Sequence, residues 1–501
     1  MRMKSHFLLY LLLFCCFSVF SQQQMSMRME RRSGLYATTI NPAALSFTPS
    51  RWEVSLFSAD FFTNQNYGYI QNASVQDVLR NPDLLVLLED LALEPGVPTA
   101  SKLPVDFYKN GRAFGVVQSR VSGPGFAFRI NQQHSVGLSA SGRFLLSSYR
   151  IPNFLRYQNV SSLNYSQTYN IEPVKIATLA WGEIAGHYAY RNFDGDRLFS
   201  MGITPKFITG IQGFYGSVNA GFDYTPIVAD TISINSANWS FGFTNDALYA
   251  ADPANYRPKT NGFGGGLDLG VSWAMPLDNP DHPEDYQWRV GVSIIDLGFV
   301  RMNRNAETHR INFDQLTILS GDTIQNAANI SPEAAIKEFS NQSLGDPNQS
   351  KTGNAFTIGL PTMFSVQFDY AIRPKLYVQG YWAQRLPIYR NALKAPNTLA
   401  VVPRYEQKWF SVSVPVVWSD YSIPRVGFGA RLGVFYVGSD DVFSWTGKNS
   451  LTGTDLYAGL KINGGQWSAK RHKRHKNRRR IFDGGLRDKD RRWKDVGCFN
   501  Q

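Results

Sequence analysis

The amino-acid sequence has little cysteine, little charge and no long apolar run after its first residues. Of the three cysteines, Cys15 and Cys16 lie in a candidate export signal, so only Cys498 remains after its removal. This excludes an intramolecular disulfide framework, and the large Phe14 argues against a lipoprotein site at the cysteine pair. No later stretch reaches the roughly 18 apolar residues typical of a membrane-spanning helix. Charged residues make up only 18% of the chain and aromatic residues 14%, which suits a wall that faces lipid on one side.

The N-terminal residues 1–21 predict a cleaved export signal. Arg2 and Lys4 provide positive charge, and residues 7–20 form a short apolar segment. This segment is shorter than the roughly 20 residues of a membrane-spanning helix, so we do not expect it to act as an anchor. Small residues precede Gln22, where we expect the mature chain to begin.

The positive charge of the chain is concentrated at its C-terminal end. Of the formal net charge of +12, residues 470–501 carry +9 and residues 5–469 carry only +1. The high isoelectric point therefore gives no reason to expect nucleic-acid binding by the body of the chain. We predict that residues 465–501 form a basic, disordered periplasmic tail. The alternatives are an anionic periplasmic partner bound by the tail, or a metal held by His472 and His475.

Residues 261–275 show the pattern on which the predicted fold class rests. Successive side chains of a strand point to opposite sides, and here one side is apolar while the other is small or polar. The apolar side holds Phe263, Gly265, Leu267, Leu269, Val271 and Trp273, and the other holds Gly262, Gly264, Gly266, Asp268, Gly270 and Ser272. These glycines do not indicate a dinucleotide-binding loop, because that loop connects a strand to a helix.

Fourteen segments share this pattern, an even number as in single-chain bacterial barrels. They predict an all-β fold, an antiparallel transmembrane β-barrel of about 14 strands. The candidate strands are 51–61, 121–130, 134–146, 174–190, 197–209, 213–225, 234–243, 261–275, 287–302, 355–370, 375–387, 405–418, 425–437 and 453–463. Residues 76–94 instead predict short amphipathic helices in a long loop or an internal plug.

The connections between these strands alternate in length. Short connections at 132–133, 192–196, 371–374 and 419–424 would lie in the periplasm, and long loops at 147–173, 303–354, 388–404 and 438–452 outside the cell. Outer-membrane barrels have this asymmetry. The exceptions are a short outer turn at 210–212 and a medium inner connection at 276–286. The alternation also slips at Ile294 and Ile295, which indicates a β-bulge.

Ionisable side chains on the polar strand faces are candidates for the lining of the lumen. They are Arg129, Arg143, Glu183, His187, Lys206, Asp268, Arg431 and Lys461. They fit either a charged constriction that selects solutes or a network of ion pairs that braces a closed lumen. Glu183 and His187 share one strand face and would also fit an acid–base pair, although a water-facing lumen tolerates such residues without catalysis. Common catalytic and metal-binding motifs are absent from the sequence, and we expect no catalytic residue, metal or cofactor.

The segment before the first strand is a candidate plug. Asn41 and Pro42 begin an Asn-Pro-Ala sequence that would either hold a plug segment or form a simple turn. We therefore divide the mature chain into an N-terminal periplasmic or plug segment at 22–50, a barrel at 51–464, and the basic tail.

Six short motifs follow one another along the mature chain. They are Asn41-Pro-Ala43, Gly123-Pro-Gly125, Ala180-Trp-Gly-Glu-Ile184, the glycines from Gly264 to Gly270, Ile295-Asp-Leu-Gly298 and Arg431-Leu-Gly-Val-Phe-Tyr-Val-Gly438. In this order they resemble an uncharacterised family of outer-membrane β-barrels from Bacteroidetes-type bacteria. That family is distantly similar to long-chain fatty-acid transporters and to porin-like proteins associated with type IX secretion. The resemblance implies a barrel exported to the outer membrane, and it implies no enzymatic mechanism.

Two classes of function remain for such a barrel. The first is passive transport of a small solute, for which an apolar solute is a candidate, across the outer membrane. The alternative is a structural role, in which an occluded barrel scaffolds an envelope or secretion complex. A barrel hydrolase is a third and weaker hypothesis. The expected partners are outer-membrane lipid and envelope or secretion-system proteins, without nucleic acid.

Overall fold

The computed structural model describes most of the mature chain. The described residues are 24–87, 102–108, 113–151, 167–194, 197–228, 231–245, 258–277, 285–320, 332–422, 424–447 and 450–466. The predictions for the export signal at 1–21 and for the tail beyond residue 466 lie outside these residues. Among the helices in the described ranges, none is long and apolar enough to cross a membrane.

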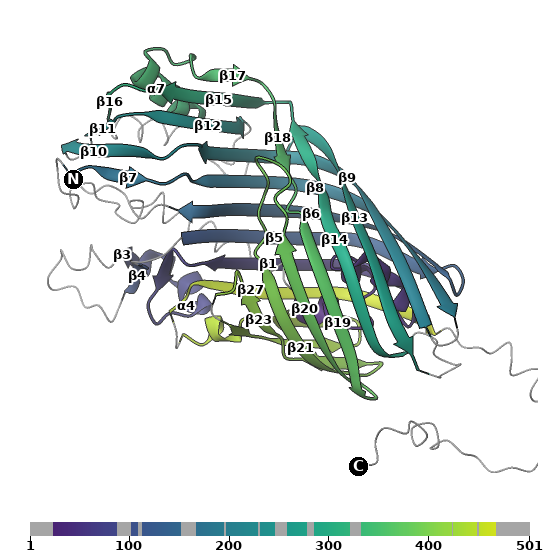
Figure 1. Ribbon diagram of the computed structural model, residues 1–501. Coiled ribbons are helices and arrows are strands. Elements are labelled where there is room, and N and C mark those ends of the chain that lie inside the picture. The colour runs from purple at the N-terminus through teal and green to yellow at the C-terminus, as the bar shows by residue number, and fades with distance from the viewer. Residues whose placement is uncertain are drawn as a thin grey trace, which may run out of the picture.

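The strands close into an antiparallel β-barrel (Figure 1). Its first strand, β1 (Ser50–Gln65), pairs with β27 (Gly453–Gln466) on one side and with β5 (Ala113–Arg129) on the other, which closes the ring. The remaining positions are β6 (His134–Ile151), β8 (Lys175–Asp194), β9 (Arg197–Val218), β13 (Gly262–Pro276), β14 (Tyr286–Met302), β18 (Phe356–Gly359) with β19 (Met363–Arg373), β20 (Leu376–Arg385), β21 (Thr398–Glu406), β22 (Phe410–Ser413) with β23 (Val416–Ser419), β24 (Arg425–Val426) with β25 (Phe428–Leu432), and β26 (Phe435–Ser439). The predicted antiparallel barrel of 14 strands is confirmed.

The connections define two ends of the barrel. The short-turn end holds the connections at 130–133, 374–375, 407–409 and 433–434, together with the start of β1 and the end of β27. The long-loop end holds the longer connections, among them the one from β6 to β8 and the one from β20 to β21. The predicted connections at 132–133 and 371–374 lie together at the short-turn end, as expected. The ends of β8 and β9, which flank residues 195–196, lie there too.

Two of the predicted strands are not separate members of the ring. The predicted turn at 210–212 is wrong, because β9 runs without interruption from Arg197 to Val218. At Ile211 one extra residue enters the pairing of β9 with β8, so the break in alternation is a β-bulge and not a turn. The segment predicted at 234–243 forms β12 (Ala237–Thr244), which pairs only with the far end of β9 and with β15 (Ala306–Phe313).

Two strands of the ring were not predicted as separate strands. The predicted loop at 388–404 contains the start of β21, in which Pro403 argues against a strand because it lacks an N–H donor. The predicted strand at 425–437 is a hairpin of β25 and β26, turned at Gly433 with a φ of +60°. These changes move the connection at 419–424 to the long-loop end, so its predicted place with the short turns is wrong.

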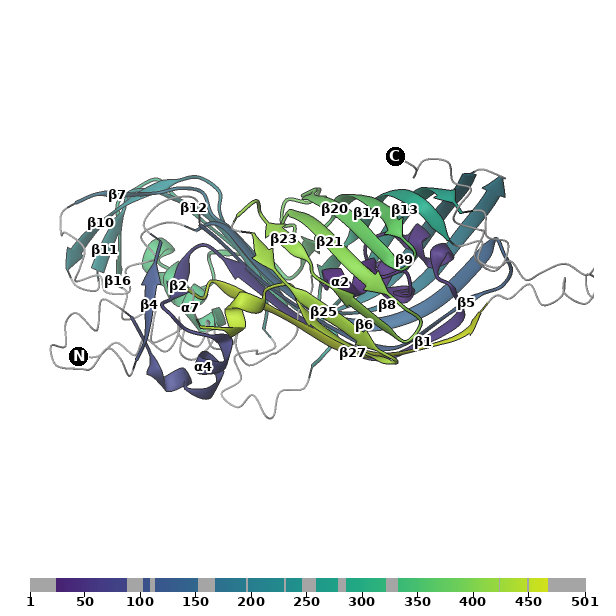
Figure 2. The ribbon, with the colours of Figure 1, turned by 90° about the horizontal axis from the view of Figure 1, so that it is seen from below.

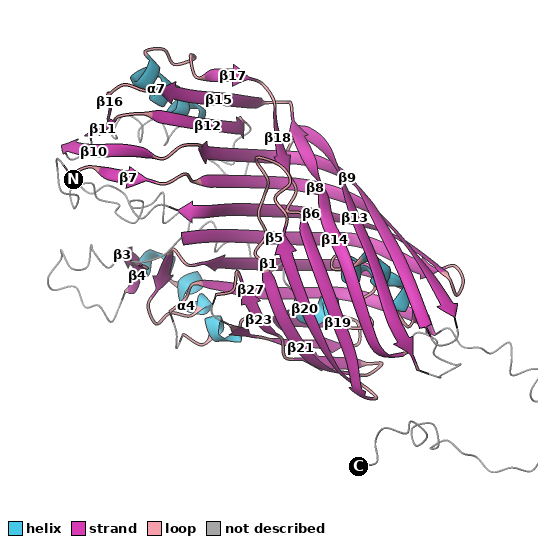
Figure 3. Cartoon of the chain, viewed as in Figure 1, coloured by secondary structure: helices cyan, strands magenta, loops and turns pink. Residues whose placement is uncertain are grey.

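A sheet extends beyond the barrel at the long-loop end (Figures 1 and 2). It carries β12, β15 and β17 (Lys351–Gly353), the four-stranded sheet of β16 (Thr317–Ser320), β11 (Thr231–Ile234), β10 (Phe222–Val228) and β7 (Tyr169–Ile171), and helix α7 (Pro332–Leu344). A second, three-stranded sheet of β2 (Gly68–Ile70), β4 (Leu103–Phe107) and β3 (Leu85–Leu87) lies beside α4 (Val75–Arg80), η2 (Pro82–Leu84) and η7 (Val442–Trp445). Of the helices predicted at 76–94, α4 is present with a Ser74–Asp77 capping box, whereas 85–87 is a strand and 88–94 lies outside the described residues. Figure 3 shows how small the helical share is.

The side chains of β13 separate into the two faces that the sequence predicts. Leu269 and Trp273 are 40% and 48% exposed on the outside, whereas Asp268 and Ser272 are buried inside. The same exposed apolar face continues on neighbouring strands, for example at Ile203, and together these faces form a belt around the barrel. An apolar surface of this extent is stable in a bilayer, and a closed ring leaves no unpaired strand edge in lipid.

Candidate functional site

The N-terminal residues fold back into the barrel. Residues 24–49, here called the plug segment, form the short helices α2 (Met25–Met29), α3 (Leu35–Thr38) and η1 (Pro42–Phe47). Figure 2 shows α2 between the two walls of the barrel. Met25 and Met29 pack against inward-facing residues such as Tyr381 and Val402. The plug segment therefore fills the half of the lumen next to the short-turn end.

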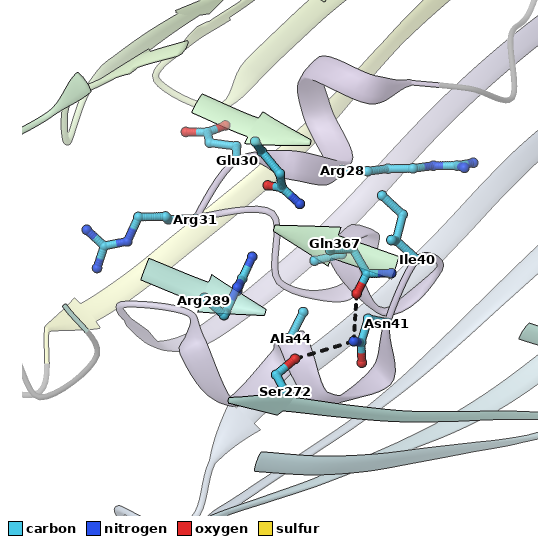
Figure 4. A pocket seen from close by; sticks show the side chains of 11 residues that line it. Arg28, Glu30, Arg31, Ile40, Asn41, Ala44, Ser272, Arg289 and Gln367 are labelled. Carbon is cyan, nitrogen blue, oxygen red and sulfur yellow. Dashed lines mark hydrogen bonds between the residues drawn. The ribbon is translucent and has the colours of Figure 1, made fainter. Parts of the chain in front are cut away.

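Asn41 attaches the plug segment to the wall strands β13 and β19. Its amide nitrogen donates to the Gln367 side chain at 2.8 Å, to the Val271 carbonyl at 3.1 Å and to the Ser272 hydroxyl at 3.3 Å. Its amide oxygen accepts the Ala43 N–H at 2.9 Å and thereby caps η1, which begins at Pro42. The Asn-Pro-Ala sequence is thus both a helix start and the point at which the plug segment meets the wall (Figure 4).

Glycines of the wall make space for this contact. A Cβ atom at Gly270 would lie 2.1 Å from the Asn41 amide oxygen, and one at Gly202 would lie 2.3 Å from the Pro42 carbonyl carbon. Both distances are far below van der Waals contact, so a larger residue at either position would displace the plug segment. The small face of 261–275 therefore receives the plug segment at this level.

Only a small cavity remains where the plug segment meets the wall. Arg28, Glu30, Asn41, Ser272 and Arg289 are among the side chains around it, and its volume is about 20 Å³. That volume admits about one water molecule. Figure 4 shows side chains from the plug segment and from the wall strands converging on this space. The described geometry leaves no continuous passage here.

Charged side chains of the wall hold the first part of the plug segment. The Arg431 Nε donates to Glu30 at 2.6 Å, and the Lys461 ammonium donates to the Ser33 carbonyl at 2.5 Å. The N–H of Met25 donates to Asp440 at 2.9 Å. Burial raises the pKa of Glu30 despite the opposing effect of Arg431, and burial raises the pKa of Asp440 to about 7.

An ion-pair network crosses the middle of the lumen. It consists of three cations and three carboxylates: Arg120, Arg143, Lys206, Glu183, Asp268 and Asp296. The Arg143 guanidinium lies 2.8 Å from Asp296 and 3.2 Å from Glu183. The Lys206 ammonium joins Asp268 at 2.8 Å and Asp296 at 2.6 Å. Because the charges balance and the groups are buried, the network favours the interpretation of a braced, closed lumen over that of an open charged constriction.

A β-bulge delivers one member of this network. The predicted slip near Ile294 and Ile295 is present as a register shift between β13 and β14, and Asp296 has a φ of +54°. This left-handed conformation is unusual for a residue other than glycine. The Asp296 N–H donates to Asp268 at 2.7 Å, and its carboxylate receives Arg143 and Lys206. The bulge thus places a carboxylate in the lumen at a point where regular alternation does not.

His187 is held apart from the network by neutral partners. One ring nitrogen lies 2.8 Å from the Ser139 hydroxyl and the other lies 3.1 Å from the Thr204 hydroxyl. Glu183 instead receives Arg120, Arg143 and the Ser141 hydroxyl. The alternative of an acid–base pair of Glu183 and His187 is therefore not assembled in this structure, since each of the two groups contacts other partners.

An apolar layer closes the lumen on the long-loop side of the ion-pair network. This apolar seal contains Phe114, Val116, Leu145, Ala177, Leu179, Trp181, Ile208, Tyr215, Val300, Met302, Ala306, Phe356, Ile358, Leu360 and Leu393. Leu393 comes from the β20–β21 connection, whose backbone bonds Gly359 at 3.0 Å and reaches the Ser147 hydroxyl of the opposite wall at 3.1 Å. The seal thus joins two walls of the barrel.

The wall is interrupted next to the ion-pair network. Gly123 and Pro124 of β5 pair with neither β1 nor β6, and two residues of β5 stand opposite Ala140 alone. Proline supplies no N–H donor, which is consistent with a bulge at this point. A cavity of about 40 Å³ lies behind the interruption and touches Gly123, His187 and Lys206.

The structure divides the predicted lumen residues into two groups. Arg143, Glu183, Lys206 and Asp268 lie in the ion-pair network, with His187 beside it. Arg129, Arg431 and Lys461 instead contact the plug segment. Any role of these residues in solute selection remains a prediction. Asp296 and Arg120 are members of the network that were not predicted from the sequence. Arg120 faces inward because the bulge at Gly123 and Pro124 shifts the alternation of β5 by one residue. In the described ranges, no group of three potential ligands is placed to hold a metal ion.

The chain belongs to a family of unknown function, DUF5723, whose model matches residues 46–440. No match is found among curated proteins. The chain also shows a likeness to solved structures. A deltaS2S3 mutant of the monoaromatic hydrocarbon channel TodX is 8% identical with a TM-score of 0.43, over 89% of this chain and 99% of that one.

Two further solved structures show a weaker likeness. A Pseudomonas aeruginosa FadL homologue is 12% identical with a TM-score of 0.24, over 89% of this chain and 98% of that one. The P. putida toluene transporter TodX is 9% identical with a TM-score of 0.29, over 86% and 94%. The closed ring and its apolar belt identify the chain itself as an outer-membrane β-barrel.

Proposed function

We propose that this member of the family passes small apolar solutes across the outer membrane, by a route that opens when the packed interior separates. The apolar seal is the observation that supports this proposal. Outer-membrane channels for polar solutes have a polar, water-filled interior, whereas in this barrel Leu145, Leu179 and Val300 meet inside. An apolar layer excludes water and ions, but an apolar solute can replace its side-chain contacts.

The neighbouring wall interruption supports an exit toward the bilayer. Pro124 faces outward, and the cavity behind it reaches the inner face of β5 and β6 at Gly123 and Ser139. A solute that left the lumen at this point would enter lipid without crossing the plug segment. The ion-pair network separates this cavity from the apolar seal, so passage requires its rearrangement.

The test compares entry of an apolar dye with entry of ions. We would express the barrel in Gram-negative cells and follow the uptake of a fluorescent phenylnaphthylamine, and record ion conductance of the purified protein in planar bilayers. Wild type should speed dye entry without discrete ion conductance, and Leu393→Ala should speed it further because it thins the seal. A matched Leu399→Ala change, at an outward-facing position of β21, should have little effect on either readout. Steady ion conductance without dye entry would contradict the proposal.

A structural role is the second candidate, and the filled lumen together with the extended sheet supports it. The plug segment, the ion-pair network and the apolar seal occupy successive levels of the lumen, and the two interior cavities described above measure about 20 and 40 Å³. A barrel without dye entry or conductance, recovered from native membranes in a defined complex with envelope or secretion-system proteins, would favour this role. We also propose that residues 1–21 are removed as an export signal, and that the tail binds an anionic periplasmic partner. An origin in Bacteroidetes-type bacteria stays a prediction.

A further inference from the structure

A wide cavity lies at the mouth of the short-turn end, outside the plug segment. Its volume is about 260 Å³, compared with about 20 and 40 Å³ for the two interior cavities. The plug segment forms its inner side, and the β19–β20 and β21–β22 turns form its rim. A space of this size admits several side chains of another molecule, whereas the interior cavities admit only one or two water molecules.

Basic residues dominate the lining of this cavity. They are Arg31, Arg32, Arg373, Lys375 and Lys408, and they face only two carboxylates, Asp285 and Glu406. Both carboxylates are already engaged by cations. Asp285 pairs with Arg31, and Glu406 pairs with Arg404, which is not part of the lining. The cavity therefore carries an excess of positive charge.

Four of the five cations form no ion pair with a carboxylate of the described part of the chain. These are Arg32 of the plug segment, Arg373 and Lys375 of one turn, and Lys408 of the next turn. Burial, followed by the nearby guanidinium of Arg431, lowers the pKa of Arg32. Crowded cations of this kind are stabilised when an anion enters between them.

A hydrogen bond and ring contacts hold the floor of the cavity. Arg31 donates to the Tyr377 hydroxyl at 2.7 Å, and the Tyr377 ring lies between the guanidinium groups of Arg31 and Arg404, at 5.4 Å and 5.1 Å. Lys375 has a φ of +75°, a conformation that glycine or asparagine adopts at lower cost. The turn thus carries a lysine at a position where the backbone favours other residues.

We propose that this basic mouth binds an acidic, extended peptide segment of an envelope protein. The cations come from three separate segments around an open mouth, an arrangement that matches several carboxylates along a chain better than one compact anion. Arg32 and Arg373 can each hold a carboxylate by two parallel N–H donors, and Lys375 and Lys408 add two point charges. The end of β27 lies at the same end of the barrel, and the residues that follow it in the sequence carry a net charge of +9, which would attract acidic partners.

The experiment uses the full mature chain in detergent and a fluorescein-labelled hexaglutamate peptide as probe. Binding is measured by fluorescence anisotropy at increasing salt concentration. The cavity variant combines Arg373→Gln, Lys375→Gln and Lys408→Gln. The matched control replaces three basic residues at the long-loop end, namely Arg301, Arg310 and Arg390, by glutamine. Both variants lose three charges and keep the tail, so the contribution of the tail to binding is the same in both.

The cavity variant should bind the peptide about tenfold more weakly than wild type, and the control should lose less than about twofold. Wild-type binding should also weaken with salt. A photo-crosslinker on the peptide should label residues 371–375 and 406–408. Equal losses in the two variants would overturn the proposal. So would inorganic phosphate that binds at the cavity while the peptide does not.

The connection between β13 and β14 provides a second critical outcome. In the sequence, Asp278, Asp281 and Glu284 stand between Leu277 and Asp285, which line the cavity. If carboxylates of the chain itself satisfied the cavity, wild type and the cavity variant would bind the peptide equally weakly, and the proposal would fail. Because the dye-uptake assay does not depend on this cavity, its outcome is independent of the outcome of the peptide titration.

Discussion

The barrel wall and the plug segment are stabilised in different ways. Wall strands such as β8 and β9 pair along most of their length, so backbone hydrogen bonds satisfy them from residue to residue. The plug segment contains no strand and depends on side chains, chiefly Asn41 and the partners of Glu30 and Arg32. Because the ladder of the wall is made by the backbone, a single side-chain change leaves its strand pairing in place. A segment held by a few specific side-chain contacts can lose them through such a change, which suggests that it can be released while the wall remains intact.

The largest effect on stability is expected in the ion-pair network, where charged side chains from different wall strands contact one another. Arg143→Met leaves Glu183 and Asp296 without their shared guanidinium, and we expect unfolding to become easier by about 3–5 kcal/mol. Urea titration in detergent micelles measures this loss. Arg143→Lys, which keeps the charge, should lose clearly less. If both variants unfold like wild type, the network does not brace the lumen.

The next effect concerns the outer face of the wall. Leu269→Arg places a charge on the lipid face of β13, and we expect a loss of about 2–4 kcal/mol in folding into vesicles if it meets the bilayer midplane. The reference variant is Arg304→Leu, near the end of β14 at the long-loop end. We expect it to change the free energy of folding into vesicles only slightly. A small loss for Leu269→Arg would mean that this face does not meet lipid. Ser272→Arg is not a mild control, because Ser272 contacts Asn41.

A smaller effect is expected at Gly270, where a larger side chain should weaken the attachment of the plug segment to the wall. Gly270→Val introduces atoms into the space of Asn41, and we expect the plug segment to be destabilised by about 1–3 kcal/mol while the barrel still folds. Hydrogen exchange of residues 24–49 reports the release, and heat-modifiability reports the barrel. Gly186→Val is the matched control, since no atom lies within 4 Å of a Cβ at Gly186. Loss of barrel folding in the Gly270 variant alone would show that wall and plug segment form one unit.

The smallest effect is a pH dependence of the plug segment. Burial raises the pKa of Asp440 from 3.8 to about 7, so the favourable contribution of its protonated form is present below pH 3.8 and is lost as the pH rises through 7. Exchange protection of residues 24–29 should therefore fall as the pH rises across this window. Asp440→Asn should flatten this change, and Asp314→Asn, at an exposed position, should leave it as in wild type. The same pH dependence in the Asp440 variant would assign it to another group.

The fold class follows from the sequence because period-two alternation is a local property. In β13 the position of a residue in the alternation is enough to predict the side of the wall on which its side chain lies. The exposed Leu269 and the buried Asp268 lie on the predicted sides. The order of the ring was harder to predict, since a bulge and a turn break the alternation in the same way. At Ile211 the break is a bulge, and at Gly433 it is a turn. Two predicted strands are not separate members of the ring, and two ring strands were not predicted as separate strands. The total therefore stayed at fourteen.

The site was predictable only in part. Asn41 and the charged residues on the lumen faces were candidates from the sequence, because their type and position were unusual for a wall. The residues that they contact could not be predicted from the sequence. Asp296 enters the lumen through a bulge with positive φ, and Asn41 meets Ser272 and Gln367 from more than 200 positions away in sequence.

The sequence alone determined that this chain forms a closed, lipid-facing barrel, because each strand must place its own apolar side chains outward to be stable in a bilayer. The tertiary structure alone decided that the barrel is filled. Whether a lumen is open depends on which side chains contact one another across it. In this barrel such contacts involve the plug segment, Leu393 and the opposite wall. No local pattern encodes such contacts, because their free energy arises only when distant strands close around the same space.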